Sequence, residues 1–260
     1  ALHEGRGTNE LFNKAQTELI EHLQSGNGAL IKKAVKALDN LGGNVSPVVQ
    51  SIASSHFKGI TDAVSDQVKL TSKVEGTSGG DETSNAQVWV KALYGHAKYD
   101  DKGDFKANET GFVAGIQKQI TDTLTVGVGY AYGHADIAQS GRDTIAQTNT
   151  GFAFARYQPN KWFVEGVVSY SRSQYEESKN ILSTASDGMY NVDTFAVQAM
   201  AGYNLDYQDI VVTPKLGLKY MNINQEAYVD SLDTNIGNNT YRYMTAIAYP
   251  NDPQGRGPTI

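Results

Sequence analysis

The sequence predicts a mainly β fold, an antiparallel meander of hairpins whose sheet curves into a barrel. About seven runs of alternately apolar and small or polar residues follow one another, at residues 88–94, 111–117, 124–132, 151–157, 162–170, 195–203 and 210–220. Polar and often acidic segments separate these runs. A two-residue period interrupted by turns is typical of consecutive β-hairpins.

The two faces of each predicted strand differ in chemistry. In the run at 124–132, Leu124, Val126 and Val128 share a bulky face with two tyrosines, whereas Gly127, Gly129 and other small residues occupy the opposite face. Glycine inside a strand usually marks a close approach of another part of the molecule. A glycine-rich wall therefore predicts space for an element inside the curved sheet.

Tyrosines near the ends of the runs fit the aromatic girdles of an outer-membrane barrel, whose lumen is polar and whose strands span about ten residues. We therefore expect the bulky face to contact lipid and the small, polar face to line a lumen. The residues expected in the girdles are Tyr94, Tyr130, Tyr132, Tyr157, Trp162, Tyr170, Tyr203 and Tyr220.

The composition agrees with a barrel and excludes several classes of protein. Mean hydropathy is −0.42 and no long apolar run occurs, which excludes a helical membrane protein because a spanning helix needs about twenty apolar residues. A spanning strand needs an apolar residue only at every second position. The absence of cysteine excludes disulfides and cysteine-ligated metals, and the net charge of −6 argues against nucleic acid as a partner.

The N-terminal part of the chain shows a helical pattern instead. Apolar residues recur at helical spacing in two segments between residues 9 and 41, with a break at 25–28. Ser46 followed by Pro47 is a favourable helix start and predicts a third, slim helix from Pro47 to about residue 69, followed by a linker at 71–85. We divide the chain accordingly into a helical junction (1–45), a helix with its linker (46–85) and a barrel (86–260).

The order of these parts is informative. A slim helix, a linker rich in Gly, Ser and Thr, and the strand start Val88-Trp89-Val90-Lys91 precede the run of tyrosine-ended hairpins. This order resembles the C-terminal translocator domain of bacterial autotransporters, the type V secretion family. The segments at 124–132, 162–170, 201–203 and 212–220 are similar to the third, fifth, sixth and seventh strands of that family, and the resemblance covers about residues 46–220.

The resemblance implies a monomeric barrel of about twelve strands in the outer membrane of a Gram-negative bacterium, with about seven or eight of the strands present here and the helix threaded through the lumen. Its partners would be outer-membrane lipid, a passenger domain in cis at the cell surface, and the barrel assembly machinery. Lumen residues expected to face the helix are Lys91, Gln117, Gln119, Gly127, Gly129, Glu165, Gln198, Lys215 and Lys219.

Four further small residues are expected to leave room for the helix: Gly133, Gly217, Ala153 and Ala155. A polar helix is stable in a polar pore but not in bare hydrocarbon. On the helix, the expected polar partners of the wall are Ser51, Ser54, Ser55, Thr61, Asp62, Ser65 and Asp66. The alternative for each charged lumen residue is a solvated channel wall.

The chain also departs from the family. Residues 241–249 suit an eighth strand, whereas 250–258 form turn and coil in our interpretation, and about four further strands with their terminal aromatic residue are absent. The chain begins at Ala1 without a signal peptide or passenger, so we expect an internal fragment or an interrupted gene product. An open sheet in lipid would leave backbone groups unpaired.

We expect no enzymatic activity, no metal and no cofactor. His56, His96 and His134 are spread over the predicted helix and two strand ends without a metal-binding spacing, and no nucleophile elbow or phosphate-binding loop occurs. Some members of the family release their passenger by cleavage at an asparagine in the lumenal helix. Asn40 and Asn44 lie before the predicted helix, so we expect no such cleavage.

Two other functions stay open at the level of sequence. The strands alone suit a plain outer-membrane barrel that acts as a pore or adhesin without a passenger. A soluble all-β binding domain would instead expose the polar wall and bury the tyrosines and valines. The translocator interpretation is preferred because it accounts for the helix and the linker as well as for the strands. The identity of the passenger is not encoded in these residues.

Overall fold

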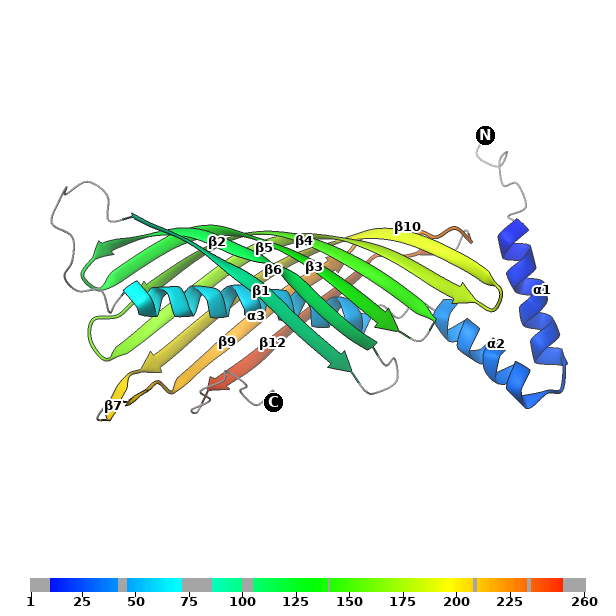
Figure 1. The fold of residues 1–260 in the computed structure, drawn as a ribbon, viewed down its shortest axis with the longest axis horizontal. Helices are drawn as coiled ribbons and strands as arrows, with labels where there is room; N and C mark the ends of the chain where they lie inside the picture. Colours follow the sequence, from blue (N-terminus) through cyan, green and yellow to red (C-terminus); the bar gives the residue numbers. More distant parts are fainter. Residues whose placement is uncertain are drawn as a thin grey trace, which may run out of the picture.

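The computed structural model describes residues 10–41, 46–71, 86–99, 105–139, 141–207, 210–232 and 235–249. A curved antiparallel sheet wraps around one helix, and two further helices lie beyond one end of the sheet (Figure 1). The linker expected at 71–85 lies outside the described residues except for Thr71, which is the last residue of a helix, and the expected coil at 250–258 also lies outside them.

The predicted helices are confirmed. They are α1 (Glu10–Gln24), α2 (Gly28–Leu41) and α3 (Ser46–Thr71). Gly26 adopts a φ of 66° between α1 and α2, a conformation that glycine reaches without steric cost. The side chain of Asn27 accepts a hydrogen bond from the backbone N–H of Ala29 at 2.9 Å and caps the start of α2.

The predicted antiparallel meander is confirmed as well. Eight strands form one sheet in the order β1-β2-β3-β4-β5-β6-β9-β12. They are β1 (Ala86–Tyr99), β2 (Phe105–Thr121), β3 (Leu124–Gln139), β4 (Arg142–Tyr157), β5 (Trp162–Ile181), β6 (Thr184–Tyr203), β9 (Lys215–Gln225) and β12 (Asn239–Tyr249). The strand expected at 241–249 is β12. The edges of the sheet are β1 and β12, and within the described residues they do not pair with each other.

The single strand expected at 210–220 is wrong, because the run is interrupted at residues 213–214. β8 (Ile210–Val212) pairs with β7 (Leu205–Tyr207) in a small hairpin, and only β9 continues the main sheet. Pro214 has no N–H to donate to a neighbouring strand. A second small hairpin, β10 (Tyr228–Val229) with β11 (Asn235–Ile236), lies between β9 and β12 in the chain.

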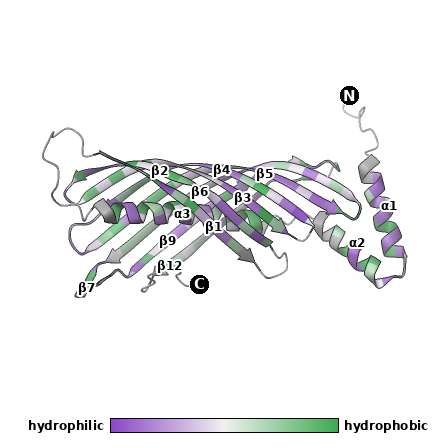
Figure 2. Ribbon diagram, in the orientation of Figure 1, coloured by the Kyte–Doolittle hydropathy of each residue, from purple (hydrophilic) through white to green (hydrophobic). Residues whose placement is uncertain are grey.

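Hydrophobic and hydrophilic residues alternate along each strand (Figure 2). Outward-facing Val88 and Leu216 are 79% and 65% exposed. The predicted orientation of the run at 124–132 is confirmed, because Val128 and Tyr130 are exposed while Ala131 is fully buried on the inner face. The sheet therefore has an apolar outer face.

Outward aromatic residues stand at two levels of the sheet. At the end of the sheet that contains the β2–β3 turn, Tyr157 and Trp162 meet edge to face with ring centroids 5.6 Å apart. Tyr203 lies opposite Trp162. Tyr170 follows Trp162 on β5 at roughly 26 Å along the strand, given a rise of about 3.3 Å per residue. At a strand tilt of about 40°, that separation corresponds to a height of roughly 20 Å, which fits within the apolar band of an outer-membrane barrel, about 25 Å tall. The remaining girdle residues, Tyr94, Tyr130, Tyr132 and Tyr220, also lie on outward faces, and their contact with lipid stays a prediction.

The strands are longer than the runs that predicted them. β5 and β6 each contain 20 residues, about twice the length needed to cross a bilayer. Beyond Tyr170 the outward positions of β5 are polar, with Arg172, Gln174 and Glu176 in succession. These hairpin ends project past the apolar band. They have no apolar outer face, so the alternating pattern did not reveal them.

Glycines on β3 make room for phenylalanines on β4. A Cβ on Gly127 would lie 2.3 Å from the ring of Phe154, and a Cβ on Gly129 would lie 2.2 Å from the ring of Phe152. Both phenylalanines face inward and pack beside Trp89, with ring centroids 6.3 and 6.4 Å from the indole. The glycines therefore accommodate side chains of the neighbouring strand, and their expected contact with α3 stays a prediction.

The expectation that Ala153 and Ala155 line the lumen is wrong. They alternate with the two inward phenylalanines of β4, and Ala155 is exposed on the outer face. On this strand the larger residues point inward, because the glycines of β3 leave a space that only bulky rings fill.

Helices α1 and α2 pack against the tip of the β5–β6 hairpin and not against the lumen. They bury Ala15, Leu19, Ala34 and Ala37 in a separate cluster with Ile181 and Leu232. One carboxylate oxygen of Glu18 accepts a hydrogen bond from the backbone N–H of Ser183 in the hairpin at 3.1 Å. The region expected to be a junction is therefore docked onto the end of the sheet.

A substitution of Gly129 by valine is expected to destabilise the sheet by about 1–3 kcal/mol, because overpacking a filled site forces side chains or backbone to move. The added Cβ would meet Phe152 and the carbonyl oxygen of Ala114 at 2.5 Å or less. Urea unfolding in detergent measures the effect. Gly151→Val is the matched control, because no atom lies within 4 Å of a Cβ at Gly151. Equal losses in both variants would contradict the proposed packing.

The docking of α1 is expected to weaken at acidic pH. The hydrogen bonds from Ser183 hold the pKa of the Glu18 carboxyl below its usual value, with smaller contributions from Lys14 and His22. The stabilisation is present above the pKa of the undocked carboxyl and is lost as pH falls through the lowered value. Fluorescence energy transfer between labels on α1 and on the β5–β6 hairpin checks this loss. Glu18→Gln should show weaker docking at neutral pH and no such transition.

Candidate functional site: the helix inside the sheet

Helix α3 runs along the inner face of the curved sheet (Figure 1). Its 26 residues are about 39 Å long at 1.5 Å per residue, enough to extend through a membrane-sized barrel. Among its described side chains only Lys58, Asp62 and Asp66 are exposed, and they form one stripe at a spacing of four residues. The other sides are enclosed by the sheet.

Three lysines of the wall bind the helix. Lys219 donates a hydrogen bond from Nζ to Oγ of Ser54 at 2.7 Å, and Lys215 donates to Oγ of Ser65 at 2.7 Å. On the edge strand β1, Lys91 donates to the backbone carbonyl of Ala63 at 3.0 Å, and its Nζ lies 3.8 Å from a carboxylate oxygen of Asp66. Lysines on β1 and β9 therefore contact α3 from separate strands of the wall.

A buried polar chain anchors the middle of the helix. His56 of α3 contacts Glu109 of β2 through Nδ1 at 2.5 Å, and both side chains are nearly inaccessible. The other ring nitrogen, Nε2, lies 2.9 Å from Oγ1 of Thr150 on β4, and this hydroxyl donates to Oγ of Ser171 on β5 at 2.9 Å. The chain joins the helix to three strands and fixes its rotation and its position along the lumen.

Small residues of the wall allow this close approach. A Cβ on Gly133 would lie 2.7 Å from Nδ1 of His56, and a Cβ on Gly95 would lie 2.7 Å from Oγ of Ser55 and 2.9 Å from Glu109. On the helix, a Cβ at Gly59 would approach Leu93 to 3.0 Å. Gly133 therefore makes room for the helix, as the sequence predicted.

Apart from Gly127 and Gly129, the expected lumen residues divide into three groups. Lys91, Lys215 and Lys219 contact α3 as described. Gln117, Glu165 and Gln198 face inward and are buried, and the first two contact other residues of the wall, since Gln117 bonds Gln87 and Glu165 pairs with Arg156 at 3.2 Å. Gln119 lies on the same face of β2 as Gln117 but is exposed beside the β2–β3 turn, and its contact with α3 stays a prediction.

The expected helix residues also differ in their surroundings. Ser54 and Ser65 accept hydrogen bonds from lysines of the wall, Ser55 lies against Gly95, and Asp66 is near Lys91. Asp62 is exposed and pairs with Lys58 of the same helix at 2.6 Å. Ser51 is half-buried and Thr61 is buried, with its hydroxyl donating to the carbonyl of Lys58. The wall therefore makes more contacts with the serines of α3 than with its aspartates.

Sequence reasoning missed the anchor formed by His56 and Glu109. The histidine was assigned no role. Glu109 lies in the polar N-terminal part of β2, ahead of the alternating run at 111–117 that predicted the strand. A signal was present in the chain, since α3 contains a single histidine, and it lies outside the stripe formed by Lys58, Asp62 and Asp66. Its partner could not be found, because 53 residues separate the two.

Among the described residues, no helix is both long and apolar enough to cross a membrane. Within the same part of the chain, no group of three or more His, Asp or Glu side chains is arranged to hold a metal ion.

Comparisons with known proteins agree with this geometry. The family model described as "Autotransporter beta-domain" matches residues 88–248. Outer membrane protein A of Rickettsia conorii is 26% identical over 223 residues, and outer membrane protein B of Rickettsia prowazekii is 29% identical over 185 residues. These alignments cover 78% and 62% of the chain but only 11% of each relative, so the chain spans about a tenth of their length.

A solved structure has a similar fold. The translocator domain of the autotransporter NalP from Neisseria meningitidis superposes with a TM-score of 0.63 at 16% sequence identity. The superposition covers 76% of this chain and 70% of that domain.

Removing one partner of the buried His56 and Glu109 pair is expected to cost about 3–5 kcal/mol in the free energy of unfolding, because the other partner stays buried without compensation. His56→Leu and Glu109→Leu should each show this loss in urea unfolding. The double variant should lose less than the sum of the two, since no polar group is then left unpaired. His96→Leu is the control, because His96 is exposed. Additive losses would show that the two side chains act independently.

Proposed function

Because the chain belongs to the autotransporter beta-domain family, we propose that it anchors and exports a passenger attached ahead of α1, and that α3 is the exported segment that stays in the lumen. The family assignment makes the chain part of an outer-membrane translocator, with its passenger at the cell surface. The observation that carries the proposal for α3 is the set of wall lysines and the His56 anchor that hold a helix inside the sheet.

The direction of the chain supports export through the sheet. Helices α1 and α2 lie at the end where β5 and β6 project beyond the aromatic belts, while α3 ends at the opposite side, toward the start of β1 (Figure 1). Outer-membrane barrels have short periplasmic turns and long extracellular ends. The β2–β3 turn, at Asp122–Thr123, lies at the end of the sheet opposite the projecting β5–β6 hairpin and is therefore assigned to the periplasmic end. The N-terminal end of α3 is therefore extracellular in the proposal.

The inner face suits a guide for a polypeptide and not a reaction centre. Its polar groups hold serine hydroxyls and a backbone carbonyl of α3. A translocator domain is a transport domain, and any catalytic activity of the whole protein would belong to its passenger.

The fold and outer face of the described sheet support the proposed partners. Backbone groups of an unpaired strand edge are costly in hydrocarbon, so an assembly machinery that protects strand edges during insertion suits an antiparallel sheet of this kind. One sheet encloses one helix of the same chain, which suits a monomer. The apolar outer face suits contact with outer-membrane lipid.

The other functions have less support. A plain pore or adhesin without a passenger would have no need for a helix bound by the lumen wall. A soluble binding domain would have to leave outward residues such as Val88, Val90 and Tyr94 in water at 71% exposure or more.

A reporter domain fused to the N-terminal end of this chain is expected to reach the surface of a Gram-negative host. Protease added to intact cells should cleave the reporter while α3 stays protected. The Lys215→Met and Lys219→Met double variant should lower reporter display or the protection of α3, because two hydroxyls of the helix lose their partners. Lys106→Met, a change at an exposed lysine, is the control. A reporter retained inside the cell with the unsubstituted chain would contradict the proposed function.

A further inference from the structure

The projecting ends of β4, β5 and β6 form a shallow hollow on the outer side of the sheet. Its volume is about 490 Å³, and Ile145, Met189 and Val229 line it with exposed fractions of 39%, 55% and 58%. Glu176, at its centre, lies roughly 20 Å beyond Tyr170 along β5, given a rise of about 3.3 Å per residue. These apolar side chains therefore stand above the aromatic belts, where hydrocarbon does not cover them.

The register of the strands places carboxylates beside the apolar residues. Ile145, Glu176 and Met189 lie opposite one another on adjacent strands and form one row. Asp143 and Asp187 stand at the two sides of the next row toward the hairpin tips. All five side chains point outward, in alternation with buried residues. Directly opposed side chains are about 5 Å apart between Cβ atoms, so one partner can contact an apolar residue and a carboxylate together.

Val229 is held outward by its buried neighbour. Residues 226–231 run along β6 and donate two backbone hydrogen bonds to it, at 2.8 and 2.9 Å. Tyr228 points inward and stacks on buried Tyr190, with ring centroids 4.6 Å apart. Because successive side chains of an extended segment point to opposite faces, Val229 lies on the outer face. The hollow is therefore preformed, since its edge is fixed by burial on the other side of the wall.

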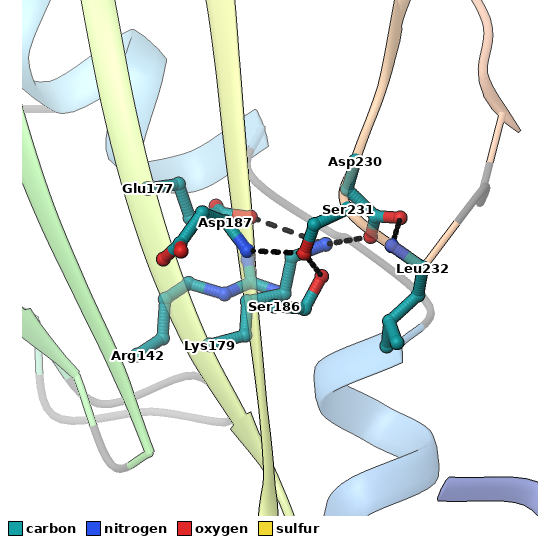
Figure 3. A network of polar contacts seen from close by, with 8 residues as sticks. All are labelled: Arg142, Glu177, Lys179, Ser186, Asp187, Asp230, Ser231 and Leu232. Atoms are coloured by element: carbon teal, nitrogen blue, oxygen red, sulfur yellow. Dashed lines mark hydrogen bonds and ion pairs between the residues drawn. The ribbon is translucent and has the colours of Figure 1, made fainter. Parts of the chain in front are cut away.

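The cations behind the hollow are paired on the inner side of the wall. Arg142 lies 3.4 Å from Glu177. Nζ of Lys179 lies 3.2 Å from Glu177 and 3.2 Å from Asp230 (Figure 3). All four side chains are buried. Two positive and two negative charges balance there, so neither cation is available to the outer face.

The carboxylates on the outer side are therefore without compensation. Within the described part of the chain, Asp143, Glu176 and Asp187 form no ion pair. Arg172, an outward base of β5 nearer to the aromatic belts, already binds two acids at 3.6 and 3.1 Å. Three negative charges thus surround three exposed apolar side chains.

These two properties together select a class of partner. Complementary charge directs association, while apolar side chains buried at the centre of a contact supply much of its binding free energy. A polypeptide in which apolar residues stand between lysines or arginines meets both requirements. A second copy of the chain is disfavoured, because each copy carries a net charge of −6.

We infer that the hollow is a docking site for a basic amphipathic polypeptide that approaches the cell from outside. The inference rests on the proposed function, because the direction of export places the projecting ends of β4, β5 and β6 outside the cell. It gives the outer wall of the translocator a binding role that is separate from the passage of the passenger.

Two short fluorescent peptides test the site on the chain inserted in nanodiscs of phosphatidylcholine. In one peptide, single valines separate pairs of lysines, and in the other, serines replace the valines, so both have the same charge. Fluorescence anisotropy should show the valine peptide binding about tenfold more tightly than the serine peptide. Empty nanodiscs measure adsorption to lipid. Equal affinities, or binding of neither peptide, would overturn the inference.

Surface variants assign the binding to the hollow. The Met189→Ser and Val229→Ser double variant should weaken binding of the valine peptide about tenfold. The Asp143→Asn and Glu176→Gln double variant should weaken it about as much and should also reduce its dependence on salt. An unchanged affinity in either double variant would show that the peptide binds elsewhere.

The matched control combines Leu205→Ser with Asp122→Asn, an exposed leucine and an exposed aspartate at the opposite end of the sheet. Its affinity for the valine peptide should equal that of the unsubstituted chain, and an equal loss in the control would overturn the inference. Urea unfolding checks that each variant is folded. Where a double variant is destabilised, Met189→Ser alone repeats the measurement.

Binding to cells separates the inference from the proposed function. The valine peptide is added to intact cells that carry the chain with its upstream reporter. Cells with the unsubstituted chain should bind several-fold more peptide than cells with the Asp143→Asn and Glu176→Gln double variant. A displayed reporter with equal peptide binding in the two strains would overturn the inference. A reporter retained inside the cell would instead count against the proposed function.

Discussion

The rest of the structure depends on one constraint, that the polar groups of α3 must find their partners on the inner wall. Little water is available between a helix and the sheet that encloses it. A polar group left there without a hydrogen-bond partner costs several kcal/mol. The wall therefore presents lysines where the helix presents Ser54 and Ser65, and a carboxylate where it presents His56. Apolar residues such as Phe57 and Ile60 are buried between these contacts. The position of the helix follows from matching both kinds of surface.

Shape adds a second constraint that acts between neighbouring strands. The lumen has to hold a helix of about 10 Å diameter, so bulk added on one strand must be removed on the next. Gly127 and Gly129 are paired in register with Phe154 and Phe152, and each ring occupies the space of the missing side chain. The phenylalanines reach Trp89 of β1 across the inner face. The space beside the glycines is thus filled by the phenylalanine rings of the neighbouring strand.

These two constraints explain how much could be predicted from the sequence. Helix bounds and strand order depend on local periodicity, and they were predicted within a few residues. The orientation of β4 depends on its neighbour, so Ala153 and Ala155 were assigned to the wrong face when size alone was considered. The anchor of His56 depends on Glu109, which is close only after the sheet has curved around the helix. The projecting ends of β5 and β6 carry polar residues on both faces. They therefore lack the alternation of apolar and polar residues that contact with lipid imposes on a membrane-spanning strand.

The energetics of the segment between β9 and β12 differ from those of the lumenal helix. A buried ion pair such as Lys179 with Asp230 contributes little net stability, because desolvation offsets its attraction, so these charges specify where residues 226–232 dock. The favourable free energy comes from apolar contacts, of which the burial of Leu232 contributes roughly 1.5–3 kcal/mol. Of the six residues that cluster with Leu232, four belong to α1 and α2. The docking of residues 226–232 therefore depends on the two helices, and the same cluster holds the helices at the end of the sheet.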